Sequence, residues 1–148
     1  MIEKFFNNFM RYCAADLAMD LGTANTLIYI KDQGLVLDEP SIVAINPDSD
    51  HGVEAVGAEA KQMFGRTHSK LETIRPMKDG VIADFDITHR MITYFIKKVV
   101  KQNSFIKPRI VIGVPTCITQ VEKKAVIEAA LMSGVREVHL IEEPMAAA

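Results

Sequence analysis

The chain of 148 residues contains no tryptophan, only two cysteines and 7% aromatic residues. Two thiols, Cys13 and Cys117, are too few for a disulfide scaffold, so we expect the reduced thiols of a cytosolic protein. The net charge of −2 and the lack of a basic stripe argue against a nucleic-acid partner. No apolar run approaches the ~20 residues of a membrane-spanning helix, and the polar residues near the N-terminus do not suit a signal peptide. With 49% hydrophobic and 24% charged residues, the composition is typical of a globular protein with one domain or two small subdomains.

The N-terminal residues 1–13 predict an amphipathic helix, because apolar side chains recur there at helical spacing. The apolar face consists of Ile2, Phe5, Phe6, Phe9, Met10 and Cys13. A helix this short needs a surface to fold against. On a bilayer, each buried Phe would contribute roughly 1.5–3 kcal/mol, and each nearby Lys or Arg about 1 kcal/mol on an anionic leaflet. The body of the protein is the other candidate surface, and the pattern alone leaves both interpretations open.

The most informative segment is the run DLGTANT at residues 20–26, which lies between apolar runs at 17–19 and 27–30. Strand, tight polar turn and strand predict a β-hairpin, with Gly22 supplying the conformational freedom of the turn. Backbone N–H groups in such a turn can converge on a phosphate, and Asp20 beside them could hold a hydrated Mg²⁺. The alternative is an ordinary Asp/Gly hairpin, since short motifs also match by accident.

The rest of the first half alternates short strands with polar turns. Strands are predicted over residues 35–37 and 41–45, followed by a surface loop at 46–52 that is dense in turn-forming residues. Residues 57–64 predict a short helix. Residues 66–80 are polar, which suits either a solvated connection or a loop that reaches toward a ligand.

The second half begins with a short predicted strand at residues 81–83. Apolar side chains at helical spacing then predict a core-facing helix from Ile87 to near Asn103. Either Asp84 or Asp86 is placed to cap its N-terminus.

A βαβ unit follows. Residues 109–115 form a continuous apolar run, typical of a strand that is buried on both faces. Thr119 followed by Glu122 predicts a capping box that opens a helix over 119–132, and residues 137–141 predict the next strand. Short links make this a right-handed unit, so we expect the two strands to be parallel.

Two carboxylates, Glu142 and Glu143, stand at the carboxyl end of this last strand, where open α/β sheets place their ligands. A glutamate there can polarise or orient a water that attacks a phosphate. The alternative is charge compensation at the start of a helix, worth about 0.3–1 kcal/mol. The turn at 20–26 favours the functional interpretation.

An antiparallel hairpin followed by such a βαβ unit resembles the actin-type ATPase fold, an α/β fold of the ribonuclease-H-like kind with a mixed sheet and flanking helices. Four motifs in order resemble the MreB family, the bacterial actins that help set rod shape: DLGTANT at 20–26, EPS at 39–41, IRPMKDGVIAD at 74–84 and IEEPMAAA at 141–148. Chaperone ATPases of this fold typically carry Thr and Asn where this chain has Ala24 and Glu142, which favours the MreB family.

The resemblance implies a role for each matching residue. Gly22, Thr23, Ala24 and Asn25 would contact the phosphates of ATP, mostly through backbone amides. Asp20 would hold Mg²⁺ through water, and Glu143 would orient the hydrolytic water.

The resemblance also implies an architecture. Residues 14–31 and 79–148 would form the larger, phosphate-side subdomain, and residues 32–78 a small subdomain inserted into it. The helix at 1–13 would bind the inner face of the cytoplasmic membrane.

For the whole protein, the resemblance implies ATP-dependent, membrane-associated filaments of the protein itself, which control cell shape and guide the cell-wall elongation machinery. The family runs to more than twice this length, so we expect the chain to carry one wall of the nucleotide site and to bind ATP weakly by itself; its own ATP hydrolysis stays open. The alternatives are a chaperone-type or sugar-kinase-type ATPase of the same fold, or an interaction module without ATPase activity.

Overall fold

The computed structural model describes residues 16–48, 52–63, 71–78, 81–100, 107–116 and 118–142. The helix predicted over residues 1–13 and the predicted water-orienting Glu143 lie outside these ranges, as does Cys117. Among the described helices, none has the length and apolar character needed to cross a bilayer.

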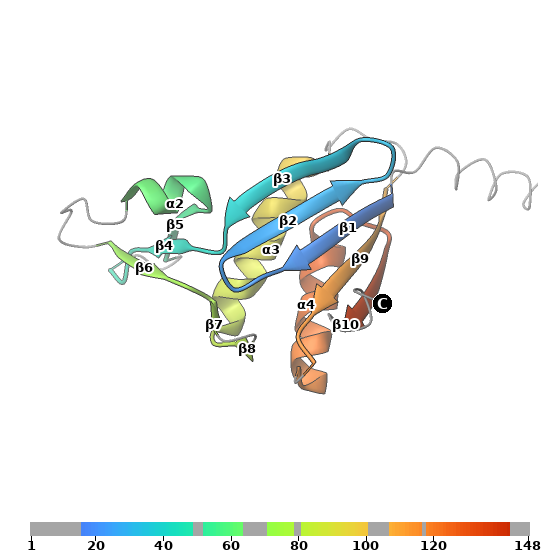
Figure 1. Cartoon of the computed structure of the whole chain (residues 1–148). Helices are drawn as coiled ribbons and strands as arrows, with labels where there is room; N and C mark the ends of the chain where they lie inside the picture. Colours follow the sequence, from blue (N-terminus) through green and yellow to red (C-terminus); the bar gives the residue numbers. More distant parts are fainter. Residues whose placement is uncertain are drawn as a thin grey trace, which may run out of the picture.

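A five-stranded mixed sheet forms the centre of the molecule, in the order β10-β9-β1-β2-β3 (Figure 1). The predicted hairpin is present as an antiparallel pair that β3 extends, while β9 and β10 run parallel to β1. The parallel pair of the predicted βαβ unit is therefore confirmed. The strands are β1 (Asp16–Leu21), β2 (Asn25–Ile30), β3 (Gly34–Pro40), β9 (Arg109–Val114) and β10 (Glu137–Glu142).

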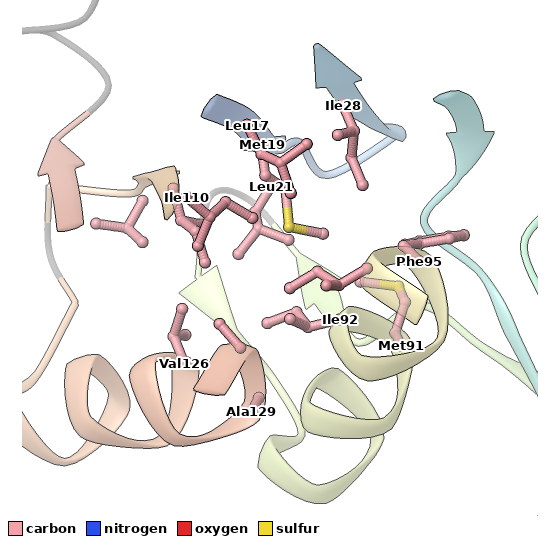
Figure 2. Close-up of a cluster of buried hydrophobic side chains, with 14 of the residues drawn as sticks. Leu17, Met19, Leu21, Ile28, Met91, Ile92, Phe95, Ile110, Val126 and Ala129 are labelled. Carbon is pink, nitrogen blue, oxygen red and sulfur yellow. The ribbon is translucent and has the colours of Figure 1, made fainter. Parts of the chain in front are cut away.

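Two helices, α3 (Phe85–Val99) and α4 (Gln120–Met132), lie against one face of this sheet (Figure 2). Alternate residues of each strand point to this face, as period-two burial requires. The core between the sheet and the helices includes Leu17, Met19, Leu21, Ile28, Met91, Ile92, Phe95, Ile110, Ile112, Val126 and Ala129.

Both helices begin at sequence-encoded caps. Asp84, rather than Asp86, caps α3 by accepting a hydrogen bond from the backbone N–H of Ile87 at 3.0 Å. The predicted capping box of α4 is present, with Thr119 and Glu122 each accepting from the other's backbone N–H. The α3 helix ends at Val99, earlier than predicted, because the next residue takes an extended conformation.

The opposite face of the sheet is not covered by α3 or α4. Val111 on β9 is 40% exposed and Tyr29 on β2 is 43% exposed, and both flank Ala18 of β1 in the strand register. The prediction that residues 109–115 are buried on both faces was therefore wrong for the described part of the chain. A continuous apolar run indicates that both faces of a strand are apolar, but it does not indicate which segment packs on each face.

A second, three-stranded antiparallel sheet follows β3 and is accompanied by α2 (Ala58–Met63). Its strands are β5 (Val53–Val56), β4 (Val43–Ile45) and β6 (Glu72–Ile74), and a small hairpin of β7 (Met77–Lys78) and β8 (Val81–Ile82) leads on to α3. The polar stretch at 66–80 thus contains two strands that we did not predict. Its Met77 is fully buried.

The strand β3 pairs with β2 in the large sheet, although our predicted small subdomain begins at residue 32. The described sheets change over after Pro40, between β3 and β4. The division of the chain into subdomains remains a prediction.

Glu39, near the end of β3, connects three elements. Its carboxylate accepts a hydrogen bond from the backbone N–H of Ala58 at the start of α2, at 3.1 Å, and forms an ion pair with Lys98 of α3. Gly57 has a φ of +68°, and a Cβ at this position would overlap the Glu39 carboxylate, so the close approach requires glycine. The hydrogen bond from Lys98 to Glu39 raises the pKa of the lysine above its ordinary value of 10.5.

This contact predicts a pH-dependent stability difference. Glu39→Gln keeps an acceptor for Ala58 but removes the charge that attracts Lys98. Because the pKa of Lys98 is raised on folding, the ion pair contributes fully below 10.5 and its contribution disappears as the pH rises through the raised value. We expect a lower urea midpoint for the variant at pH 8, and a smaller difference from the unmodified chain as the pH rises above 10.5.

Glu54→Gln on the exposed side of β5 is the matched control, and it should leave the midpoint unchanged. Equal midpoints for Glu39→Gln and the unmodified chain at pH 8 would show that the contact contributes nothing measurable.

Candidate functional site

The turn between β1 and β2 consists of Gly22, Thr23 and Ala24. It is tight: a Cβ built on Gly22 would overlap the backbone carbonyl oxygen of Asn25. Position 22 therefore requires glycine for a steric reason, as the sequence predicted. Ala24 and Asn25 are exposed, and Thr23 is half-buried.

Ser41, which follows β3, holds this turn from behind. Its backbone N–H donates to the carbonyl of Ala24 at 2.9 Å, and its hydroxyl donates to the carbonyl of Gly22 at 2.7 Å. The Thr26 hydroxyl lies 3.0 Å from the Ser41 hydroxyl, and both side chains are fully buried. The turn is thus fixed by a residue 19 positions away in the sequence.

These contacts determine which way the peptide units of the turn face. The described chain has no cis peptide bond, so each carbonyl points opposite to the N–H of the next residue. With the carbonyls of Gly22 and Ala24 directed at Ser41, the amides of Thr23 and Asn25 point away from it. Outward-pointing backbone amides are the donors that a phosphate-binding turn needs.

Asp20 lies on the face of the sheet opposite to α3 and α4. In the register it stands beside Leu27 of β2 and Gly113 of β9. Its carboxylate oxygen Oδ1 lies 3.7 Å from the position that a Cβ on Gly113 would occupy. Gly113 therefore leaves room beside the carboxylate. A glycine inside an apolar strand is the sequence signal that could have identified this position.

The side chain of Asn25 is engaged within the protein. Its amide donates to Asp38 Oδ1 on β3 at 2.7 Å. This agrees with the expectation that Asn25 acts mainly through its backbone. Asp38 was not singled out in the sequence, and it lies in register with Leu27, which also pairs with Asp20.

The carboxyl end of β10 lies at the same sheet edge as the turn, because β1, β9 and β10 are parallel. One strand, β9, separates it from β1, which corresponds to roughly 10 Å between the outer strands. Glu142 lies 3.5 Å from Lys123 Nζ of α4, so its charge is compensated on the helix-covered face. The neighbouring Glu143 is outside the described residues.

Within the described ranges, no group of three or more His, Cys, Asp or Glu side chains could hold a metal ion. Asp20 is therefore not part of any such group among the residues that the structure describes. The structure brings together Asp20 and the predicted turn residues 22–25, and it adds Thr26, Ser41 and Gly113, to which the sequence analysis assigned no role.

Comparison with known proteins connects this arrangement to one family. A family model described as MreB/Mbl protein matches residues 14–148. The cell shape-determining protein MreB of Escherichia coli is 56% identical over 153 residues, covering 100% of this chain and 43% of that protein. The cell shape-determining protein Mbl of Bacillus subtilis is 53% identical, covering 91% of this chain and 40% of that protein. The chain thus spans less than half the length of these relatives.

Solved structures agree with the sequence relatives. The crystal structure of MreB5 of Spiroplasma citri bound to ADP has a TM-score of 0.72 and 30% identity, covering 88% of this chain and 39% of that chain. A MamK double helical filament has a TM-score of 0.70 at 23% identity, covering 89% of this chain and 42% of that chain, and shows the fold alone. The predicted actin-like fold is confirmed, and the chain belongs to the MreB/Mbl family.

Proposed function

We propose that this chain supplies one wall of an ATP site in a cell shape-determining protein that forms filaments. The observation that carries this proposal is the turn held by Ser41, whose bonds direct the amides of Thr23 and Asn25 away from Ser41, together with the carboxylate of Asp20 just before the turn. The structures of Spiroplasma citri MreB5 bound to ADP and to AMPPNP support a nucleotide as the ligand.

In this proposal the residues keep the roles that the family resemblance implies. The backbone amides of residues 22–25 bind phosphate oxygens, and Glu143 orients the water for hydrolysis. Mg²⁺ usually keeps several water ligands and binds through one or two carboxylates plus phosphate oxygens. Asp20 acting through a water ligand is consistent with this kind of Mg²⁺ coordination.

The activity of the whole protein extends the proposal beyond this chain. The names of the relatives in Escherichia coli and Bacillus subtilis support a role in determining cell shape. The cell-wall elongation machinery is the partner that the family resemblance implies. Self-association into filaments is part of the proposal because the family resemblance implies it. We propose residues 32–78 as an inserted subdomain beside 14–31 and 79–148, and residues 1–13 as a helix that attaches to the inner face of the cytoplasmic membrane.

The nucleotide proposal predicts weak, turn-specific binding. In an NMR titration with Mg-ATP, the amide signals of residues 22–25 should shift, with a dissociation constant in the millimolar range because one wall lacks the closure that excludes water. Asp20→Asn should remove the part of the response that depends on Mg²⁺. Asp32→Asn is the matched control, because Asp32 has a positive φ that asparagine also tolerates and lies in the β2–β3 turn, at the opposite end of β2 from the candidate site.

Each outcome has a clear meaning. The absence of turn shifts at high millimolar Mg-ATP would rule out the phosphate assignment. Tight, stoichiometric binding by calorimetry would instead contradict the idea that this chain carries only one wall of the site.

The membrane proposal predicts sedimentation with anionic vesicles. The chain should pellet with vesicles that contain phosphatidylglycerol, and Phe5→Ser together with Phe9→Ser should abolish pelleting, since each Phe loses roughly 1.5–3 kcal/mol of burial. Asn7→Ser, on the predicted polar face, is the control.

If residues 1–13 instead fold against the body of the protein, the unmodified chain will stay in the supernatant. The double Phe variant will then show a lower thermal unfolding temperature rather than a change in pelleting.

A further inference from the structure

We propose that Ser41 is a positioning residue of the phosphate turn: its hydroxyl selects the orientation of the Gly22–Thr23 peptide, and Thr26 orients that hydroxyl. This inference rests on the proposed function and identifies the contact that holds the turn in the orientation for phosphate binding. It starts from three hydrogen bonds of Ser41: a buried one with Thr26, a part-buried one to the carbonyl of Gly22 and a backbone one to the carbonyl of Ala24.

The direction of the hydroxyl bonds follows from counting hydrogens. The carbonyl of Gly22 can only accept, so the single hydroxyl hydrogen of Ser41 is used in that 2.7 Å bond. The 3.0 Å contact between Ser41 and Thr26 must then be donated by Thr26. Thr26, Ser41 and Gly22 therefore form one directed chain that ends on the carbonyl oxygen of Gly22.

This chain ends on the Gly22–Thr23 peptide. Rotating that peptide changes ψ of Gly22, which glycine tolerates, and φ of Thr23, which a β-branched residue resists at positive values. If the Gly22–Thr23 peptide rotated by half a turn, the amide of Thr23 would point toward Ser41 instead of outward. The two hydroxyls of Ser41 and Thr26 oppose this, because they carry two hydrogens and, once the carbonyl of Gly22 has rotated away, one of these hydrogens has no acceptor within the pair.

The second half of the turn is held in a different way. The carbonyl of Ala24 accepts from the backbone N–H of Ser41 at 2.9 Å, and no side-chain substitution at position 41, other than proline, removes that donor. The amide of Asn25 should therefore keep its direction when the hydroxyl is lost. This gives the inference a specific signature, since only one of the two outward amides depends on the side chain.

The test compares Ser41→Ala with Ser133→Ala in the complete chain. Ser133 is also buried and donates its hydroxyl hydrogen to a backbone carbonyl, that of Ala129 at 2.6 Å, but it lies at the end of α4. Both variants lose one buried hydroxyl, so a general loss of stability affects both. Thr26→Val, which removes the donor to Ser41 and keeps the volume, is the third variant.

In NMR titrations with Mg-ATP and with inorganic triphosphate, we expect Ser41→Ala to lose the shift of the Thr23 amide, retain that of Asn25 and bind about three- to tenfold more weakly. Thr26→Val should show a smaller effect, and Ser133→Ala none. If Ser41→Ala does not fold, Ser41→Cys keeps a similar volume with a weaker donor and should give the same pattern.

The results separate the inference from the function. If the unmodified chain shows no turn shifts with either ligand, the proposed function fails and the inference fails with it. If the unmodified chain responds and Ser41→Ala responds equally at Thr23, the positioning role is overturned while the phosphate site stands. Equal losses at Thr23 and Asn25 would also overturn it, because they would mean that the whole turn had been disrupted.

Discussion

The fixed geometry of the turn depends on one contact, the pair of bonds from Ser41 to the carbonyls of Gly22 and Ala24. The same strand end also carries Glu39, whose carboxylate reaches α2 and α3. Glu39 pairs with Lys98 of α3, and Ser41 contacts Thr26, which stands beside the core residue Leu21 in the register, so both act on the helix-covered side of the sheet. Residues 39–41 thus link the turn, the small sheet and the main helices. A displacement of α2 and a displacement of the turn would both act on this segment.

The two faces of the large sheet have different roles: one carries the hydrophobic core, and the other carries the candidate ligand Asp20. The face under α3 and α4 holds the fully buried core, including Met19 and Ile112. Asp20 belongs to the other face, where Gly113 leaves space beside its carboxylate. A carboxylate at the buried position of Met19 would have to lose its hydration among apolar side chains, which is costly. The alternation of β1 therefore places the core residue Met19 and the candidate ligand Asp20 side by side in the sequence but on opposite faces.

Local patterns in the sequence predicted the elements whose causes are local. The hairpin, the capping box at Thr119 and the parallel pair around α4 each follow from spacing within a few residues. The strands β5 and β6 were missed because they are short and carry polar residues, and their stability comes from pairing with β4. The exposure of Val111 was missed for a related reason, since an apolar run does not identify what covers it. Asp20 and the turn were found because glycine, carboxylate and small polar residues are adjacent in the chain. The partners that orient them come from distant residues and needed the fold.

The motif at residues 20–26 is ambiguous as a sequence because a hairpin turn and a phosphate-binding turn use the same small residues. The two differ in where the carbonyls point. If the carbonyl of Gly22 faced the solvent, it would repel a phosphate, since both carry negative charge on oxygen. Directed at the buried Ser41, the same carbonyl takes its negative end out of the site and turns the amide of Thr23 outward. In our proposal the Ser41 hydroxyl thereby sets the electrostatic character of the turn, and this links the EPS motif at 39–41 to the turn motif across the 12 residues between them.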